Sequence, residues 1–401
     1  MNRWRDNLRA FEDIRASSMG HQGSSTFCKI ALLILAVTQC YVISATSSNG
    51  VVQEARLEIT LSQPLTVSWL YSSEATTNLT PATDGARLYL PLSSGLLISL
   101  NAQDGQLNWK TEIGGELSSS PVADQHGVYV ASEIGSSQKS EAHANGALRA
   151  LGRDGGITLW RRALPMPIQG GLIASESNLY GGSSDGRVYA VKKQTGDIVW
   201  TMQHSAPFNS QPSIFGTRLY IGSDDGNLFA IDKSTGQVAW RYRTQGAIHG
   251  TSVVVNGLIY FGSTDGYVYA LKETDGSLRW RRRTGASVQT VADARSGLLV
   301  VSLDNYVYCL SYGNGDRLWK RQMAGRIASA PLTATDGALF TPLSSSIGVV
   351  LDLHNGKQIN SLPLDEDNSI TAAPIAAGKV LLITTRHGLI AFSRPGLQRH
   401  L

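Results

Sequence analysis

The chain has 401 residues, of which 42% are hydrophobic and 16% are charged, and its formal net charge is +4. The hydrophobic share is sufficient for a folded core, and the modest charge excludes the strongly basic surface of a dedicated nucleic-acid-binding protein. Three cysteines, at positions 28, 40 and 309, exclude an internal disulfide framework and a cysteine-rich metal site.

The N-terminal part contains an export signal. Residues 30–45 are uncharged and largely apolar, and they follow Lys29 and four arginines. This run is shorter than the roughly 20 residues of a membrane-spanning helix, so it favours the apolar region of a signal peptide with cleavage after Ala45 or Ser47. An uncleaved anchor and a lipid anchor on Cys40 are the alternatives.

Each of these alternatives exports the rest of the chain, so we expect a periplasmic, membrane-anchored or extracellular protein. We assign residues 1–45 to the leader, with Met1 or Met19 as its start, and 46–64 to a polar linker. Residues 30–45 are the candidate membrane tether.

A phrase that recurs about every 40 residues organises the remainder. It runs from Gly226 to Trp240 as GNLFAIDKSTGQVAW, and close copies end at Trp200 and Trp280. The tryptophan positions are 69, 109, 160, 200, 240, 280 and 319, and Asn360 holds the next equivalent place. A period of this length indicates one supersecondary unit stacked against copies of itself.

Each unit contains four short strand signals separated by turns rich in Gly and Asp, and nothing in the repeats predicts a helix. Four antiparallel strands per unit are typical of a β-propeller blade. The first strand signal, residues 65–69, has no partners of its own, whereas the last unit lacks its fourth strand. We therefore predict an all-β, eight-bladed propeller over residues 65–393, with 65–69 completing the last blade and 394–401 as a C-terminal tail.

The repeated phrase resembles that of the pyrroloquinoline-quinone (PQQ)-type β-propeller family. In that family the tryptophan docks against the neighbouring blade. The resemblance therefore implies a structural role for Trp109, Trp160, Trp200, Trp240, Trp280 and Trp319. Asn360 departs from the pattern, so we expect its blade contact to be the weakest.

The family includes quinoprotein dehydrogenases, which hold PQQ above a calcium ion, near a catalytic Asp and often a disulfide between adjacent cysteines. This sequence has no adjacent cysteines and no obvious Glu, Asn and Asp set for calcium. Its size, blade count and export signal are more similar to the non-catalytic branch that includes the propeller lipoprotein of the outer-membrane β-barrel assembly machinery. The resemblance therefore implies neither PQQ nor calcium.

A polar column precedes the innermost strands and is the candidate binding funnel. Aligning the units on the proline of that strand brings eight positions into register, and only Ala328 among them is apolar. The polar members are Asn78, Ser118, Gln169, Asn209, His249, Gln289 and Thr371. A water-filled channel is the alternative to a ligand site. His249 is the one titratable member, which disfavours a metal site.

Two further features vary between repeats. Residues 132–146 add eleven residues to the second unit, as a polar loop on one rim that either contacts a partner or is neutral. Basic residues follow the tryptophans at 161–162, 241, 243, 281–283 and 320–321, where they either protect strand edges or face an acidic partner or anionic lipid.

These observations predict a non-catalytic, monomeric scaffold that presents its loops to other envelope proteins, with outer-membrane protein assembly as the candidate process. Two alternatives belong to different classes. One is a quinone-dependent dehydrogenase-like enzyme. The other is a membrane-anchored sensor or adhesion propeller.

Overall fold

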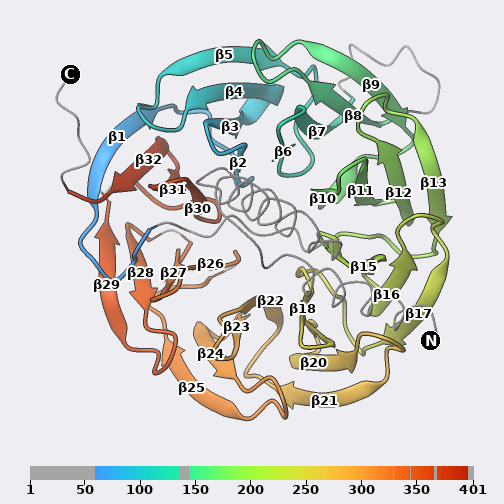
Figure 1. The fold of residues 1–401 in the computed structure, drawn as a ribbon, viewed down its shortest axis with the longest axis vertical. Helices are drawn as coiled ribbons and strands as arrows, with labels where there is room; N and C mark the ends of the chain where they lie inside the picture. The colour runs from blue at the N-terminus through green and yellow to red at the C-terminus, as the bar shows by residue number, and fades with distance from the viewer. Residues whose placement is uncertain (1–58, 135–143, 328, 344, 365–367, 396–401) are drawn as a thin grey trace, which may run out of the picture. The chain divides into compact units, whose positions relative to one another are not determined.

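Thirty-two strands form eight four-stranded antiparallel sheets that close into a ring (Figure 1). The computed structural model describes residues 59–134, 144–327, 329–343, 345–364 and 368–395. The predicted eight-bladed propeller is confirmed. The short turn η1 (Ser93–Gly95) is the one helical element among the described residues.

In each of the first seven blades, the four strands follow one another from the axis of the ring outward (Figure 1). Blades 1 to 4 consist of β2 (Ala82–Thr83), β3 (Arg87–Leu92), β4 (Leu96–Asn101) and β5 (Leu107–Glu112); β6 (Val122–Ala123), β7 (Val128–Glu133), β8 (Gly146–Leu151) and β9 (Thr158–Leu164); β10 (Ile168–Ala174), β11 (Asn178–Ser183), β12 (Arg187–Lys192) and β13 (Ile198–Gln203); and β14 (Ser213–Phe215), β15 (Arg218–Gly222), β16 (Asn227–Asp232) and β17 (Val238–Arg243).

The remaining four blades repeat this order until the chain ends. Blades 5 to 8 consist of β18 (Val253–Val255), β19 (Leu258–Gly262), β20 (Tyr267–Lys272) and β21 (Leu278–Arg283); β22 (Val288–Asp293), β23 (Leu298–Ser302), β24 (Tyr306–Leu310) and β25 (Arg317–Gln322); β26 (Leu332–Thr333), β27 (Ala338–Phe340), β28 (Ile347–Leu351) and β29 (Gln358–Pro363); and β30 (Ile375–Ala377), β31 (Val380–Thr385), β32 (Gly388–Ser393) and β1 (Thr66–Ser72).

The core is divided among the spaces between neighbouring blades. Tyr220 and Ala230 of blade 4 pack against Phe261, Tyr269 and Leu271 of blade 5, for example, and all five are at most 1% exposed. The middle strands of each blade therefore read as nearly continuous apolar runs, because both of their faces are covered. Cys309, on β24, is one of these fully buried side chains.

Each tryptophan of an outer strand packs onto the next blade. Trp240 Nε1 donates a hydrogen bond to the carbonyl oxygen of Glu273, at 3.0 Å, in the turn between β20 and β21. A Cβ atom on Gly276 in that turn would lie 2.6 Å from the indole ring, and Gly276 has a φ of +71°. Glycine is therefore required both for the close approach and for the left-handed backbone. Trp69, Trp109, Trp160, Trp200, Trp280 and Trp319 make the same contacts.

The ring closes through the first strand. β1 pairs antiparallel with β32, from Thr66 opposite Ser393 to Ser72 opposite Gly388, and becomes the outer strand of blade 8 (Figure 1). The predicted closing strand, residues 65–69, thus overlaps β1 but begins one residue before it and ends three residues too early. An open ring would leave the apolar faces of two blades exposed to solvent, and the pairing of β1 with β32 prevents this exposure.

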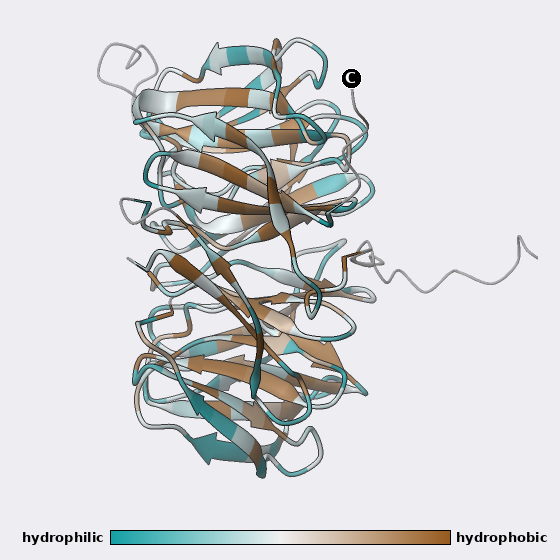
Figure 2. Ribbon diagram, turned by 90° about the vertical axis from the view of Figure 1, so that its left-hand side faces the viewer, coloured by the Kyte–Doolittle hydropathy of each residue, from teal (hydrophilic) through white to brown (hydrophobic). Residues whose placement is uncertain are grey.

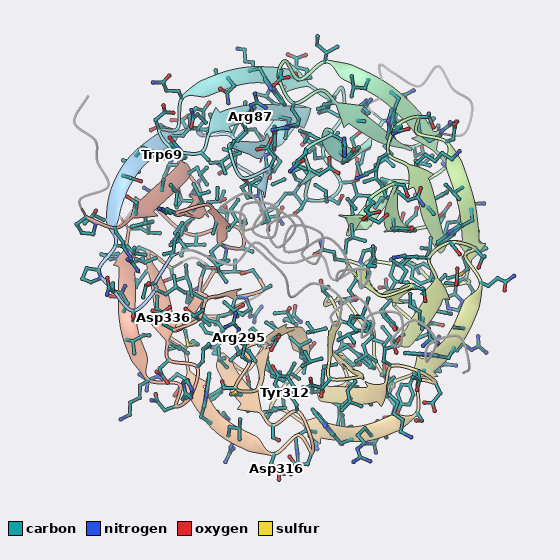
Figure 3. The ribbon with its side chains drawn as sticks, viewed as in Figure 1. Trp69, Arg87, Arg295, Tyr312, Asp316 and Asp336 are labelled. Carbon is teal, nitrogen blue, oxygen red and sulfur yellow. The ribbon has the colours of Figure 1, made fainter. Side chains whose placement is uncertain are left out.

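Residues before β1 also belong to the ring, although the sequence placed 46–64 in a linker. Ile59 and Leu61 are 3% and 0% exposed, and they pack between blades 7 and 8. The carboxylate of Asp336 accepts the backbone N–H groups of Leu61 and Ser62, at 3.1 and 2.7 Å. Figure 3 shows Asp336 at this junction. Because Ile59 and Leu61 stand among polar residues, the sequence shows no apolar run here, and their burial was not predicted.

Asn360 occupies the tryptophan position of blade 7 because its neighbour differs. The last two strands of blade 8, β32 and β1, are far apart in the sequence, so no glycine turn joins them. An indole ring at position 360 would therefore have no such turn to pack against. Asn360 Nδ2 instead donates to the carbonyl oxygens of Leu61 and Gln63, both at 2.8 Å. The contact expected to be the weakest is made by hydrogen bonds to the N-terminal segment.

Candidate functional site

The polar column lies on one face of the ring, together with the turns between the second and third strands of the blades. Strands alternate in direction within a blade, so the turns between second and third strands share a face with the connections that lead to the next inner strand. In blade 4 these are the turn at 223–226 and the connections at 204–212 and 244–252. The backbone hydrogen bonds from Asp224 N–H to the Pro207 oxygen and from Ile248 N–H to the Ser223 oxygen join them. We call this the entrance face.

The side chains of the column differ in their exposure to solvent. Asn78, Gln169 and His249 are exposed, whereas Ser118, Asn209, Gln289 and Thr371 are partly buried. Ala328 lies outside the described residues.

Several column side chains are engaged by the fold itself. Ser118 Oγ donates to the Ile168 oxygen of the next blade, at 2.6 Å. Gln289 Nε2 donates to Ser287 Oγ at 3.3 Å, and Thr371 Oγ1 is buried with no hydrogen-bond partner in the described part of the chain. The column is therefore not a uniform ligand-facing ring.

Only Asn209 and His249 of the column converge on one group, the carboxylate of Asp224. Asn209 Nδ2 donates to one Asp224 oxygen at 2.7 Å, and His249 Nε2 lies 3.2 Å from the other. That second oxygen has no partner of good hydrogen-bond geometry in the described residues. That oxygen is also buried, so the Asp224 carboxylate links the two connections through one hydrogen bond to Asn209 and one close contact with His249.

The carboxylate of the neighbouring Asp225 accepts more hydrogen bonds than that of Asp224. Its carboxylate accepts hydrogen bonds from Ser223 Oγ at 2.5 Å, Asn227 Nδ2 at 2.9 Å and His204 Nε2 at 3.0 Å. Burial alone would raise the pKa of Asp225, but these hydrogen bonds outweigh it and lower the pKa to about 2. His204 also packs edge-on against Phe229, with ring centroids 4.9 Å apart.

In the sequence, Asp224 and Asp225 belong to one of the turns rich in Gly and Asp, for which turn formation was the expected role, and His204 was not among the candidate site residues. The available signal was an Asp-Asp pair in one turn with a histidine in the connection on each side, about half a repeat away. Despite this gathering, the described residues contain no group of three or more His, Cys, Asp or Glu side chains suited to a metal ion. The cluster is a hydrogen-bonded polar surface.

The inserted segment begins and ends inside the blade 2 ladder. Ser132 and Glu133 belong to β7 and Gly146 begins β8, with Glu133 directly opposite Gly146. The predicted loop boundaries at 132 and 146 were therefore too wide, and most of the insertion, residues 135–143, lies outside the described residues.

Most of the basic residues that follow the tryptophans lie on three consecutive outer strands, which we call the basic wall: β17, β21 and β25. Arg161 and Arg162 lie apart from it, on β9. The three strands of the wall carry nine cations and no carboxylate: Arg241, Arg243, Arg279, Arg281, Arg282, Arg283, Arg317, Lys320 and Arg321. In the side view of Figure 2, outer strands at the lower end, where Figure 1 places β21 and β25, are teal.

A groove of 680 Å³ on the opposite face lies between blades 2 and 3. His126, Glu176, Ser177, Lys192 and Gln194 are among its polar lining residues. Lys193, whose side chain is 6% exposed, bonds Asp124 at 2.6 Å, so the most buried cation is already paired. Burial, followed by the charge of Asp124, raises the pKa of Tyr129 above its usual range.

No helix among the described residues is both long enough and apolar enough to cross a membrane.

Comparison with known proteins gives one consistent match. The family model described as outer membrane protein assembly factor BamB matches residues 58–143, 144–251 and 245–399. The BamB protein of Shewanella oneidensis is 34% identical over 119 residues, which cover 28% of this chain and 27% of that protein. The Yersinia pestis BamB is 28% identical over 127 residues, which cover 30% of this chain and 29% of that protein. The aligned part thus spans less than a third of these relatives.

Solved structures show the same fold in proteins of different function. BamB from Moraxella catarrhalis superimposes with a TM-score of 0.67 at 18% identity, over 84% of this chain and all of that one. A quinohemoprotein alcohol dehydrogenase from Comamonas testosteroni gives 0.68 at 10% identity, over 86% of this chain and 79% of that one. A computationally designed protein, Ika8, gives 0.70 at 14% identity, over 82% of this chain and 99% of that one. At these identities the likeness is one of fold alone.

Proposed function

Since the chain belongs to the family of the outer membrane protein assembly factor BamB, we propose that it is an exported, non-catalytic scaffold that contributes to outer-membrane protein assembly by binding other envelope proteins. The observation that carries the proposal is the match of the family model along residues 58–399, which takes in all eight blades.

The ring itself suits a scaffold. Its blades are joined by buried apolar clusters and by tryptophan docking, so its loops are held in fixed relative positions. The entrance face offers the exposed side chains of Asn78, Gln169 and His249, and the imidazole of His249 lies against the Asp224 carboxylate. Polar groups of this kind in a rigid setting give a protein contact its specificity.

The test is affinity capture of the full chain from cells that express it, after reversible crosslinking and mass spectrometry of the envelope fraction. We expect components of the outer-membrane barrel assembly machinery to be enriched over a capture that uses an unrelated exported propeller. Deletion of the gene should lower the amount of folded barrel proteins in the outer membrane. Unchanged barrel levels, together with enrichment of a different set of partners, would contradict the proposal.

The sequence also suggested a quinone-dependent enzyme, and a separate measurement addresses it. Calorimetry of the full chain with PQQ and Ca²⁺ should show no stoichiometric heat. Tight one-to-one binding would instead favour the enzyme.

A further inference from the structure

The basic wall carries most of the positive charge of the outer strands. β17, β21 and β25 hold nine cations and no carboxylate. Among the other five outer strands, β9 carries Arg161 and Arg162, β5 carries Lys110 and Glu112, and β1, β13 and β29 have no charged residue. Charges can protect a free strand edge, but all eight blades present such an edge. Edge protection therefore does not account for a cluster on three adjacent blades.

Some of these cations have structural partners. Arg282 Nη2 lies 2.5 Å from the carboxylate of Asp316 in the next blade, which Figure 3 shows at the rim. The Arg281 guanidinium lies 5.1 Å from the centre of the Tyr267 ring, and Lys320 Nζ lies 3.5 Å from that of Tyr306. These contacts keep three of the positive charges at fixed places on the wall.

The other six cations of the wall are exposed and form no ion pair within the described residues: Arg241, Arg243, Arg279, Arg283, Arg317 and Arg321. Like charges close together on a sheet repel one another and destabilise it. An anionic partner would remove that repulsion, so the wall is complementary to negative charge.

The spacing of the cations indicates an extended partner. Arg281 and Arg283 occupy alternate positions of β21, beyond the β-bulge at Arg279, and so lie on one side of the strand. Arg241 and Arg243 repeat this spacing on β17. Alternate residues of a strand are about 6.7 Å apart, which is also the spacing of alternate carboxylates in an extended peptide.

The curvature of the ring distinguishes a polypeptide from a membrane. Eight blades complete a circle, so each turns the wall by about 45°, and the three basic strands together turn through about 90° (Figure 1). A flat bilayer would lie against one strand and diverge from the other two, and exposed charges farther away than about 8 Å are screened at physiological salt. A flexible chain can follow the curve.

We propose that the basic wall binds an extended, carboxylate-rich segment of a polypeptide. This site goes beyond the proposed function, because it lies on the outer strands and uses none of the entrance-face residues. Its recognition is electrostatic, with arginine guanidinium groups donating paired hydrogen bonds to carboxylates.

The test uses the full chain and a fluorescent peptide of about 12 residues in which Asp alternates with Ser, long enough to follow one outer strand and reach the next. Fluorescence anisotropy should show binding that weakens as salt is raised, and an Asn-Ser peptide should not bind. The triple variant Arg241→Glu, Arg283→Glu and Arg321→Glu should lose affinity by about tenfold or more.

The matched control reverses three exposed lysines on other blades, Lys110→Glu, Lys192→Glu and Lys357→Glu, and alters the net charge equally. This control should change the affinity less than about twofold. Should the glutamate variant fail to fold, Gln at the same three arginines is the substitute, with an expected loss in the same direction.

Equal weakening by the wall and control variants would overturn the proposal, since net charge alone would then explain binding. It would also fail if the wall variant lost binding to vesicles of anionic phospholipid but kept its affinity for the peptide. Capture of the barrel assembly components should be the same for the wall variant and the unmodified chain, so the two proposals can fail separately.

Discussion

The repeated tryptophan stabilises the ring through both packing and a hydrogen bond. Trp319 is 8% exposed and donates to the Leu353 oxygen at 2.9 Å, against the glycine turn at Gly356. We expect Trp319→Ala to lower the free energy of unfolding by about 3–5 kcal/mol, because a large buried side chain is lost. Urea denaturation followed by circular dichroism measures this.

The adjacent residue supplies the control for that substitution. Leu318 is 52% exposed on the same strand, and Leu318→Ala should change the free energy by less than about 0.5 kcal/mol. Equal losses for both variants would show that β25 itself, rather than the indole contact, determines the stability of this junction.

Asp225 should make the stability of the entrance face depend on acid. Its folded pKa, about 2, lies below that of a free aspartate, so its contribution is complete above about pH 4 and is lost as the pH falls through 2. The contribution is about 1–2 kcal/mol after allowance for partial exposure.

The measurement compares the unmodified chain with Asp225→Asn by chemical denaturation at several pH values. The difference in unfolding free energy should be largest near neutral pH and should shrink below pH 4. A difference that persists unchanged to pH 2 would mean that the Asp225 charge has no part in it.

At the residue scale, the sequence repeat predicted which residues occupy equivalent positions in the blades, but not which side chains they contact. The seven tryptophans could be placed because each is followed by a similar blade. The column residues could be aligned, yet their partners could not be read from spacing. Asn209 and His249 meet at Asp224 only because two connections pack against one turn, and such a contact between separate loops leaves no periodic signal.

At the scale of elements, the seam between blades 7 and 8 differs in chemistry from the other junctions. Asn360→Trp restores the residue of the repeat but should not restore its contact, because blade 8 has no glycine turn there. The variant loses two hydrogen bonds, to the oxygens of Leu61 and Gln63. We expect the unfolding free energy to fall by about 1–3 kcal/mol.

Thermal unfolding of the Asn360→Trp variant, measured beside the unmodified chain, checks this expectation. A higher unfolding temperature in the variant would show that the seam accepts an indole ring in the way the other junctions do.

The four-strand pattern of a blade was predictable because it recurs in the sequence. The contacts of the segment before β1 were not. Ile59 and Leu61 are single apolar residues among polar ones, and no copy of this segment exists elsewhere in the chain to reveal a pattern. Their burial arises from the gap between two specific blades, which only the closed ring creates.

At the scale of the whole molecule, we expect the fold not to depend on which blade contains the two ends of the ring. The Arg394 guanidinium hydrogen-bonds Thr60 Oγ1, so the two ends of the ordered ring lie together. A circular permutant that joins residue 395 to 59 through a short Gly-Ser linker, and opens between 138 and 139 in the polar insertion, should keep the fold.

Far-UV circular dichroism and thermal melts test the permutant, which should unfold cooperatively and keep the β spectrum of the unmodified chain. The comparison is a chain truncated before residue 73, which lacks β1 and should not form a soluble ring. If the permutant failed to fold, the native order of the blades would itself be required.

The pairing of β1 with β32 also sets the order in which the molecule can mature. Thr66 and Ser393 are partners, so a strand near the beginning of the chain must wait for the last residues to be made and exported before it is covered. Val67 and Leu70 remain largely exposed even in the finished ring, at 44% and 59%. Contacts between such distant residues form slowly, and uncovered strands aggregate in the interval. Blade 8 therefore stays incomplete until β32 is available, and residues 388–393 determine when the ring can close.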